Sequence, residues 1–381
     1  MSVLLGICGS IAAYKTHELI RLLIKNHIPV HPVLTEDALN FVTRTSIGTL
    51  SGCKPYHSLY ENEEGADHLR LTKETDILVI APATAHTIAK CALGLCDNLL
   101  TTLFLAYRGP KLICPAMHTE MWENPTTMSH IQSLRQSGCH ILGPITGDLA
   151  CGDSGTGRMV DPTLIVEAIQ CYLKDPLPLA QKSILISSGG TSEPIDPVRN
   201  ISNASTGKLG HSMAHMAAFM GAKVTLVTTK PIVSNPLITS IKTVSTASDM
   251  QKTLQELIPS HDTLIMSAAV SDFTVAPSPQ KLNRKSSHHL NLIQVPDILS
   301  SLSSHKSNKT YIGFSLADKN TQKIALEKLH SKNLDFIVSN TSDNIGSDIR
   351  NVDIYSQNGL KKNLVNQSVS DTAHEILQLI P

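Results

Sequence analysis

The sequence has no surplus of either charge and no hydrophobic run of transmembrane length. Its 381 residues carry 32 lysines and arginines against 32 aspartates and glutamates. This balance argues against a protein that binds nucleic acid through bulk charge. The longest stretches without a charged residue, 1–14 and 209–222, have 14 residues each. Because a helix needs about 20 residues to span a bilayer, neither is expected to cross a membrane.

Targeting signals and paired cysteines are also absent. No basic segment precedes the N-terminal apolar run, so no secretory signal is predicted and a cytoplasmic protein is expected. The eight cysteines include no CxxC pair, which argues against zinc spacings, and in the cytosol they should be reduced and mostly buried. All eight lie within the first 171 residues. This break supports two domains, a number that the chain length also predicts.

The alternation of apolar runs and helical patterns predicts two α/β domains. A segment with two prolines and no periodic pattern predicts a linker over 176–182, between domains 1–175 and 183–381. Each domain repeats the βαβ pattern of a doubly wound, mostly parallel sheet. Strands are expected over 2–8, 29–34, 76–82, 111–114, 182–187, 223–228, 263–268, 311–314 and 335–339. Helices are expected within 9–27 and over 208–221 and 321–332, with a polar, basic loop over 278–289.

Small and hydroxyl residues follow three predicted strands of the first half. Gly9 and Ser10 let backbone N–H groups approach a phosphate near a helix N-terminus, although they also suit a plain tight turn. The dinucleotide pattern GxGxxG is absent here. Thr35 either adds a hydroxyl to the same phosphate or caps the next helix, which begins near residue 36. Ala83 and Thr84 suit a flat ring system or close helix packing.

Two residues of the first half are candidates for proton transfer. His68 is a lone histidine, which is either catalytic or structural. Cys151 begins the run CGDSGTGRM, in which three glycines in six residues predict a flexible flap. A cysteine on such a flap is expected to be exposed, with its thiol able to act as an acid.

Basic and hydroxyl residues of the second half suit phosphate binding. The segment 205–208, STGK, precedes a predicted long helix and has the ending of a P-loop without its full pattern. His211 and His215 lie four apart without an evident third ligand, so no zinc site is predicted there. Five basic residues either neutralise a triphosphate or form a solvated face: Lys281, Arg284, Lys285, Lys328 and Lys332.

Nine short segments, spread over nearly the full length of the chain, resemble the motifs of one protein family and occur in the same order as in that family. They are GSIAAYK, APATA, PAMHTEMW, ACGDSGTGRM, EPIDPVRNISNASTGKLG, AAVSDF, VPDI, GFSLAD and KNLDFIVSN. On these segments the chain resembles the bacterial bifunctional phosphopantothenoylcysteine decarboxylase/phosphopantothenate–cysteine ligase family of coenzyme A biosynthesis. The resemblance implies an α/β fold class: a flavodoxin-like FMN domain of the homo-oligomeric flavin-containing cysteine decarboxylase type, followed by a Rossmann-like ligase domain.

For the first domain the resemblance implies decarboxylation of phosphopantothenoylcysteine to 4'-phosphopantetheine with FMN. The flavin would oxidise the cysteinyl thiol so that carbon dioxide can leave. His68 matches the family's active-site base and Cys151 its acid, while His118 and Met121 match positions that hold the substrate. The flavin would contact Gly9, Ser10, Thr35, Ala83 and Thr84.

For the second domain the resemblance implies ligation of cysteine to 4'-phosphopantothenate through an acyl-cytidylate made from CTP. Asn203 would stabilise the acyl-cytidylate, and Lys281 would act on the phosphates or the transition state. Mg²⁺ would be bound mainly by phosphates and waters, without a carboxylate cage, so no protein metal ligands are assigned. The nucleotide would contact Ala268, Asp272, Lys281, Pro296, Asp297, Ile298, Phe314, Lys328 and Lys332.

The sequence departs from the family at a few positions, and two other functions compete. Many members have asparagine where this chain has His118, which can still donate to a carboxylate.

The partners implied are small-molecule substrates and further copies of the chain, with the FMN site at a subunit contact. The alternatives are a regulatory flavoprotein subunit, which the presence of His68 and Cys151 argues against, and a redox flavoprotein using NAD, which the absent GxGxxG argues against.

Overall fold

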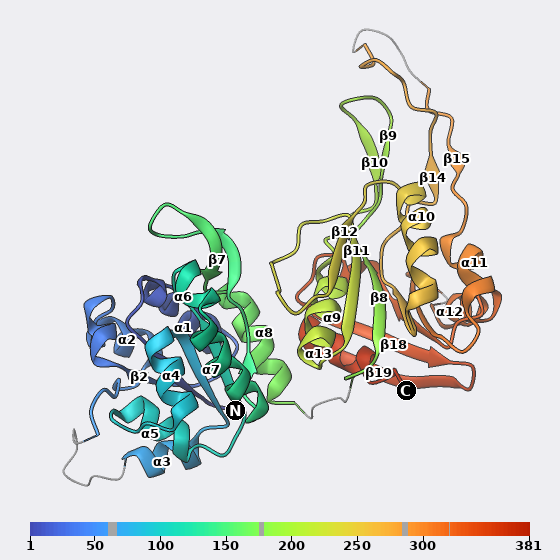
Figure 1. The fold of residues 1–381 in the computed structure, drawn as a ribbon. Coiled ribbons are helices and arrows are strands. Elements are labelled where there is room, and N and C mark those ends of the chain that lie inside the picture. The colour runs from blue at the N-terminus through green and yellow to red at the C-terminus, as the bar shows by residue number, and fades with distance from the viewer. Residues whose placement is uncertain (60–66, 175–178, 284–288, 320) are drawn as a thin grey trace. The chain divides into compact units, whose positions relative to one another are not determined.

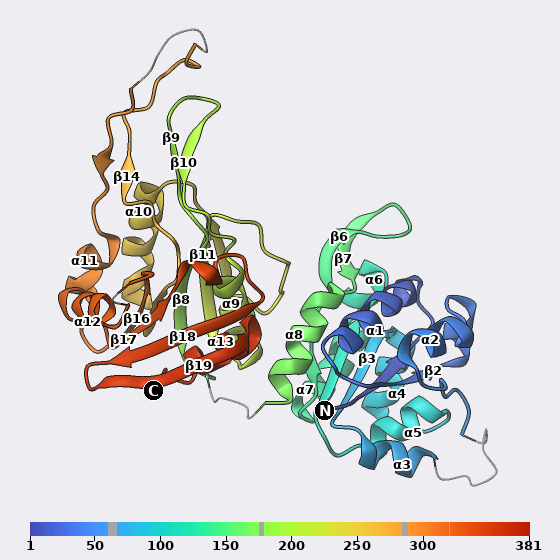
Figure 2. The same cartoon turned by 180° about the vertical axis from the view of Figure 1, so that it is seen from behind.

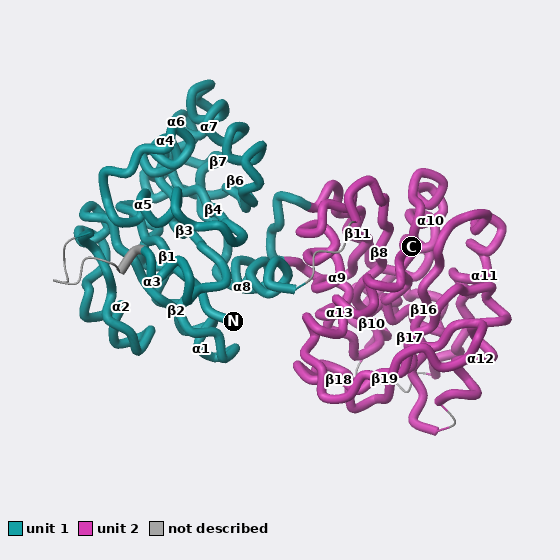
Figure 3. The backbone as a smooth tube through the Cα atoms, turned by 90° about the horizontal axis from the view of Figure 1, so that it is seen from below, with its two compact units in different colours: residues 1–176, 233–237 teal, residues 177–232, 238–381 magenta. Residues whose placement is uncertain are grey.

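A computed structural model describes residues 1–59, 67–174, 179–283, 289–319 and 321–381, with the backbone alone for Asp67 and His68. The chain forms two compact units, residues 1–176 with 233–237 and residues 177–232 with 238–381 (Figure 3). None of the helices in the described ranges is long and apolar enough to span a membrane.

The first unit is built on five parallel strands in the order β2-β1-β3-β4-β5. β1 and β3 are apolar and buried along their whole length, as central strands covered on both faces require. This order is the doubly wound, flavodoxin-like one. The strands are β1 (Val3–Ile7), β2 (Val30–Leu34), β3 (Ile77–Ala83), β4 (Lys111–Pro115) and β5 (His140–Ile141).

The helices of this unit pack in two groups, as a doubly wound sheet requires. α1 packs against α2 and α8, whereas α4 packs against α5 and α7. Local sequence sets several starts: Asn98 and Thr101 form a capping box on α5, and Asp161 caps α8 with proline at its first position. The helices are η1 (Ile11–Lys15), α1 (Thr16–Lys25), η2 (Glu36–Asn40), α2 (Arg44–Ser51), α3 (Asp67–Glu74), α4 (Ala85–Leu93), α5 (Leu99–Ala106), α6 (Thr119–Glu123), α7 (Pro125–Gln136) and α8 (Pro162–Tyr172).

A two-stranded antiparallel ribbon, β6 (Ile145–Asp148) with β7 (Ser154–Arg158), extends from the first unit (Figure 1). Five of the eight cysteines lie buried in this unit and none forms a disulfide, which confirms the expectation that most are small core residues. The buried ones are Cys8, Cys91, Cys114, Cys139 and Cys171.

The second unit has an eight-stranded sheet in the order β12-β11-β8-β13-β16-β17-β18-β19. The first six are parallel, and β18 and β19 are antiparallel to their neighbours. Figure 2 shows β18 and β19 as the long red hairpin of this unit. The strands are β8 (Ser183–Ser188), β11 (Lys223–Thr228), β12 (Ser240–Thr243), β13 (Thr263–Met266), β16 (Thr310–Leu316), β17 (Phe336–Asn340), β18 (Ile349–Ser356) and β19 (Gly359–Ser368).

Two short ribbons and several helices complete the second unit. α9 packs closely on the sheet because it carries Gly210, where a Cβ would lie 2.5 Å from Oγ of Ser188 and 2.6 Å from Oγ of Ser267. The ribbons pair β9 (Ser192–Pro194) with β10 (Asn200–Ser202) and β14 (Phe273–Thr274) with β15 (Ile293–Gln294). The helices are α9 (Lys208–Phe219), α10 (Ala247–Leu257), η3 (Ile258–Ser260), α11 (Ile298–Leu302), η4 (Ser303–His305), α12 (Thr321–Ser331), η5 (Ser342–Asn344) and α13 (Val369–Leu377).

The predicted fold class, two α/β domains with mostly parallel sheets, is confirmed. The expected strand over 223–228 coincides with β11, and the other expected parallel strands lie within two residues of observed ones. The helix expected near residue 36 is a short 3-10 helix, η2. The loop expected over 278–289 is irregular as far as residue 283, and residues 284–288 of it lie outside the described residues.

Candidate active sites

The predicted flavin residues lie at one edge of the first sheet. Gly9 and Ser10 follow β1, Thr35 follows β2, Ala83 ends β3 and Thr84 follows it. β1 and β3 are neighbours whose connections lead to opposite sides of the sheet. Open α/β sheets bind ligands at the carboxyl ends of such a pair of strands. The structure therefore brings all five residues to the edge where a ligand is expected.

The hydroxyl of Thr35 is buried and finds no hydrogen-bond partner among the described residues. Thr35 occupies the N-cap position of η2, but its side chain makes no capping hydrogen bond, and its backbone N–H donates to the carbonyl of Ile7. The loop after β1 lies close by, since a Cβ at Gly9 would be 2.4 Å from Cβ of Asp37. An unpaired buried hydroxyl costs free energy, so a ligand with a polar group at this edge would satisfy it.

Two other hydroxyls at this edge act as helix caps. Oγ of Ser10 accepts a hydrogen bond from the N–H of Ala12 at 3.3 Å, and Oγ1 of Thr84 accepts one from Thr87 at 3.4 Å. The side chain of Ala83 is fully buried. Ser10 and Thr84 therefore act as helix caps, and Ala83 packs in the core. Among the predicted flavin residues, only Thr35 has a hydroxyl without a partner in the described part of the chain.

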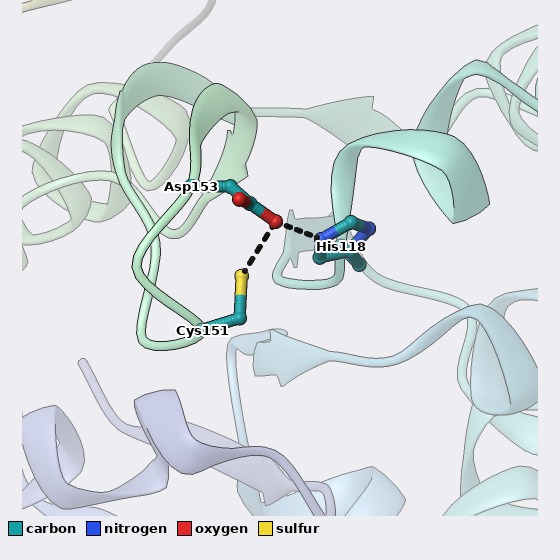
Figure 4. Close-up of side chains that lie close together, drawn as sticks. All are labelled: His118, Cys151 and Asp153. Atoms are coloured by element: carbon teal, nitrogen blue, oxygen red, sulfur yellow. Dashed lines mark hydrogen bonds and ion pairs between the residues drawn. The ribbon is translucent and has the colours of Figure 1, made fainter.

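A second group of side chains gathers where β4 ends and the β6–β7 ribbon turns. His118 follows β4, while Cys151 and Asp153 lie in the turn of the ribbon. Nε2 of His118 lies 3.2 Å from Oδ2 of Asp153, and Sγ of Cys151 donates to the same oxygen at 3.5 Å (Figure 4). Nδ1 of His118 contacts the carboxylate of Glu120. Asp153 therefore joins an imidazole and a thiol that are far apart in the sequence.

Two glycines of β7 bring the ribbon against the residues that follow β4. A Cβ at Gly157 would lie 2.1 Å from the carbonyl oxygen of Met117, and one at Gly155 would lie 2.2 Å from Oγ1 of Thr119. The N–H of Met117 donates to the carbonyl of Gly157 at 3.0 Å. The sequence predicts flexibility from these glycines, whereas in the structure they permit close packing. Cys151 is exposed at the turn, as expected.

The charges in this group favour a protonated His118. Its hydrogen bond with Asp153 raises the pKa of His118, partial burial opposes this, and the negative charge of Glu120 acts in the raising direction. The pKa of Asp153 is in turn lowered by the hydrogen bonds from His118 and Cys151. An imidazolium at this position is suited to bind a carboxylate.

The remaining residues of the first site differ in how they are placed. Met121 lies on α6, half exposed, and its N–H donates to the carbonyl of His118 at 3.1 Å. The backbone of His68 lies in α3, and its side chain is outside the described residues. Sequence reasoning missed Asp153. Its signal was present, because this carboxylate stands two residues after an exposed cysteine in ACGDSGTGRM.

In the second unit Asn203 bridges the ends of neighbouring strands. It follows β10, and its Nδ2 donates to the carbonyls of Ala269 and Val270, at 3.2 and 3.0 Å, just after β13. A Cβ at Gly190, after β8, would lie 2.7 Å from the carbonyl oxygen of Asn203, so glycine is needed for this approach. β8 and β13 are adjacent strands with connections to opposite sides. Asn203 therefore lies at the switch point of this sheet.

The segment that carries Lys281 is fixed by the buried carboxylate of Asp196. This carboxylate accepts hydrogen bonds from the N–H groups of Leu282, Val198 and Arg199. The Arg199 guanidinium donates to Asp196 at 2.7 Å and to the carbonyl of Leu282 at 3.3 Å. Burial raises the pKa of Asp196, but these hydrogen bonds outweigh it and lower the value to about 2. Sequence reasoning missed Asp196, although it stands in the quoted segment EPIDPVRN. Asp196 holds the backbone of Leu282, and the side chain of the preceding residue, Lys281, is exposed.

The other predicted nucleotide residues differ in what their side chains can offer. Ala268 follows β13 and Phe314 lies near the end of β16, both half-buried. Nζ of Lys332 lies 2.8 Å from Oδ2 of Asp297, so this lysine is ion-paired in the structure. The side chain of Ile298 belongs to the core. Three remain: Asp272 and Pro296 are exposed, and Lys328 is half-buried.

Two protein families match the chain in succession. The flavoprotein family matches residues 1–174, and the DNA/pantothenate metabolism flavoprotein C-terminal domain matches residues 179–381. Among solved structures, the C-terminal domain of the coenzyme A biosynthesis bifunctional protein CoaBC is 32% identical, with a TM-score of 0.45, covering 53% of this chain and 95% of that one. A mutant PPC decarboxylase complexed with pantothenoylaminoethenethiol is 35% identical, with a TM-score of 0.42, covering 46% and 98%.

The relatives that match most of the chain are all described as the same bifunctional protein. The coenzyme A biosynthesis bifunctional protein CoaBC of Vibrio parahaemolyticus is 39% identical over 345 residues, which cover 89% of this chain and 86% of the relative. The CoaBC proteins of Haemophilus influenzae and Escherichia coli are 35% and 34% identical, covering 99% and 94% of this chain and 97% and 91% of their own lengths. With both family matches in the same order, the chain belongs to the CoaBC family of bifunctional coenzyme A biosynthesis proteins.

Proposed function

We propose that the chain ligates cysteine to 4'-phosphopantothenate with CTP and then decarboxylates the 4'-phosphopantothenoylcysteine to 4'-phosphopantetheine with FMN. The observation that carries this proposal is the match of both family domains, in order, to nearly the whole chain. The ligase would occupy residues 183–381 and the decarboxylase residues 1–175, joined by a linker over 176–182. The net decarboxylation is redox-neutral, since the product thiol has the oxidation state of the substrate thiol.

FMN fits the edge of the first sheet that ends in Gly9, Thr35 and Thr84. The unpaired buried hydroxyl of Thr35 supports a ligand there that carries hydrogen-bonding groups. When bound, the flavin supplies the transient two-electron oxidation that lets carbon dioxide leave. The chain contributes binding and orientation, with Ser10 and Thr84 ordering the turns on either side through their capping hydrogen bonds.

Four side chains of the first unit would handle the substrate. The imidazolium of His118 binds the substrate carboxylate until it leaves, with Met121 beside it on α6. Cys151 donates its thiol proton to the enethiolate that remains after decarboxylation. Its exposed place at the turn of the ribbon and its hydrogen bond to Asp153 support this role. His68 would act as the base.

In the second unit the carboxylate of 4'-phosphopantothenate would attack the α-phosphate of CTP, releasing pyrophosphate. The amine of cysteine would then displace CMP. Asn203 would stabilise the acyl-cytidylate, and the exposed Lys281 would neutralise charge on the phosphates. Mg²⁺ would be held mainly by phosphate oxygens and water. Lys328 and Lys332 would bind the nucleotide once Lys332 exchanges its ion pair with Asp297 for a phosphate.

The FMN edge would lie at a contact between copies of the chain. Large apolar side chains are exposed beside it: Ile11 at 57% and Tyr14 at 60% on η1, and Phe41 at 45% just after η2. Large exposed apolar side chains that gather on one face are typical of protein interfaces. A homo-oligomer would cover these side chains and close the site.

A product assay tests the whole proposal. The purified chain receives 4'-phosphopantothenate, cysteine, CTP and Mg²⁺, and the products are read by mass. We expect 4'-phosphopantetheine, carbon dioxide, CMP and pyrophosphate. Accumulation of phosphopantothenoylcysteine would contradict the decarboxylase half and leave the ligase. Absence of any cysteine adduct would contradict the ligase half and favour a regulatory flavoprotein.

Thr35→Val should weaken FMN binding without destabilising the protein. The substitution removes a hydroxyl that has no described partner in the unliganded site, so the midpoint of thermal unfolding should stay or rise. One lost hydrogen bond to the ligand costs about 1–2 kcal/mol, or roughly a 5–30-fold rise in the FMN dissociation constant. Flavin titration by fluorescence quenching measures it.

Thr75→Val is the matched control. Its buried hydroxyl donates to the carbonyl of Leu71 at 2.6 Å, away from the FMN edge. This variant should lose stability and keep its FMN affinity. Equal FMN affinity in Thr35→Val and the unsubstituted protein would remove Thr35 from the site.

A further inference from the structure

The group formed by His118, Cys151 and Asp153 has the chemistry of a transition-metal site. It offers one imidazole nitrogen, one sulfur and one carboxylate oxygen, and these three ligand atoms lie within 4.8 Å of one another (Figure 4). This mixed set of nitrogen, sulfur and oxygen suits Zn²⁺ and its close neighbours in the first transition row. Hard cations such as Mg²⁺ prefer oxygen ligands alone, so they are a poor match.

The separations already approach those of a tetrahedral metal site. Ligand bonds of about 2.0–2.3 Å at tetrahedral angles place ligand atoms about 3.3–3.6 Å apart. The imidazole Nε2 lies 3.2 Å from Oδ2 of Asp153, and Sγ of Cys151 lies 3.5 Å from that oxygen. The third pair, the imidazole nitrogen and Sγ, lies within 4.8 Å, so side-chain rotation would have to close this distance for one ion to contact all three, with water as the fourth ligand.

The residues around the group orient its ligands. Nδ1 of His118 contacts the carboxylate of Glu120, which is the arrangement that holds a metal-bound histidine with its other nitrogen toward the metal. Both ring nitrogens face carboxylates, so a cation bound between Nε2 and Asp153 could take the place of the ring proton there. The tight turn, closed by hydrogen bonds between Leu149 and Asp153 and between Gly152 and Leu149, fixes the two ribbon ligands.

We propose that His118, Cys151 and Asp153 bind one Zn²⁺ or similar divalent metal ion per chain, and that this ion reversibly blocks decarboxylation. The metal binds the thiolate of Cys151 and the neutral ring of His118, so any proton on these two ligand atoms passes to solvent. The thiolate, the carboxylate and the neutral ring then balance the dication. The metal-bound sulfur has no proton to donate, and the ring nitrogen is no longer free for the substrate. The inhibitory part rests on the proposed decarboxylation.

Metal binding is tested on the purified full-length chain without substrate, in a buffer and phosphine reductant that do not bind metal. Co²⁺ is the spectroscopic probe, and Zn²⁺ displaces it. We expect one Co²⁺ per chain, a thiolate-to-cobalt absorption band, and release of up to two protons on metal addition. His118→Asn, Cys151→Ser and Asp153→Asn should each weaken binding at least about tenfold.

Cys96→Ser is the matched control, because Cys96 is the other exposed cysteine and lies on a different segment. It should keep the stoichiometry and the absorption band. A band that persists in Cys151→Ser, or disappears in Cys96→Ser, would overturn the site. Retention of bound flavin reports that each variant is folded.

Inhibition is measured separately, with phosphopantothenoylcysteine supplied directly. Saturating Zn²⁺ should lower the decarboxylation rate about 10²-fold or more, and a chelator should restore it. Any activity that remains in Asp153→Asn should need at least about tenfold more Zn²⁺ for the same inhibition. Zn²⁺ that binds at the three residues without slowing the reaction would overturn the inhibitory role. A protein that binds Co²⁺ but never decarboxylates would contradict the proposed function and leave the metal site.

Discussion

Cys151→Ser is expected to stop 4'-phosphopantetheine formation while leaving cysteine ligation intact. A serine hydroxyl is a far weaker acid than a thiol, so the enethiolate left after carbon dioxide departs would not be protonated. General acids contribute about 10²–10⁴-fold to such steps, and a loss of this size is expected. The thiol is exposed at the ribbon turn and hydrogen-bonds Asp153, so its removal disturbs no buried packing.

Three readouts separate this result from simple misfolding. Carbon dioxide should still be released in a single turnover, the flavin should remain bound and reduced, and mass analysis should find an oxidised, decarboxylated species in place of product. Cys96→Ser again serves as the control, because its sulfur makes only weak contacts to the carbonyls of Gly94 and Thr101. Unchanged product formation in Cys151→Ser would remove the acid role.

Central parallel strands were predictable from sequence because burial on both faces demands continuous apolar runs. β3 is buried over its whole length, and its run ILVIAPA has no polar residue. The same logic places ligand residues, since whatever follows a parallel strand arrives at one edge. The strand pattern placed Gly9, Thr35 and Thr84 each after a parallel strand, and the family resemblance joined them in one flavin site; in the structure all three lie at the same edge.

The antiparallel hairpin β18–β19 was not predicted because its apolar pattern is weak. Only some residues of β18 are buried, and β19, which is rich in lysine and asparagine, has no buried residue. The alternation of apolar and polar residues that marks a strand with one buried face is therefore hard to recognise in these two strands. The β6–β7 ribbon was missed because its glycines carry no hydrophobic signal, and they were interpreted as flexibility. Their function, close approach to Met117 and Thr119, depends on residues distant in sequence.

The same limit applies to Asp153 and Asp196. Each stands inside a quoted motif, but its role depends on a partner elsewhere in the chain: His118 for Asp153, and the backbone of Leu282 for Asp196. A single sequence places residues on elements but gives no distance between separate loops. Such pairings could be found only from coordinates.

Asn203→Asp is expected to slow ligation about 10²–10³-fold, the size of effect seen when one donor to a developing charge is removed. Nδ2 of Asn203 holds the carbonyls of Ala269 and Val270, and a carboxylate there would repel both oxygens. The same new charge would oppose the negative charge that develops on the acyl group as the amine of cysteine attacks the acyl-cytidylate. Transfer to cysteine should therefore suffer more than pyrophosphate release, and acyl-cytidylate should accumulate when cysteine is limiting.

The Asn200→Asp variant is the control that separates the effect of an added negative charge from the effect of its position at residue 203. Asn200 is exposed on β10 of the same ribbon, three residues before Asn203, so it adds an equal charge without touching the switch point. It should ligate at nearly the rate of the unsubstituted chain. Asn203→Gln retains the amide on a longer side chain and should recover part of the lost rate. The two aspartate variants could instead release pyrophosphate at the same rate and transfer the acyl group at the same rate. In that case the amide of Asn203 only holds the loop after β13 and takes no part in the chemistry.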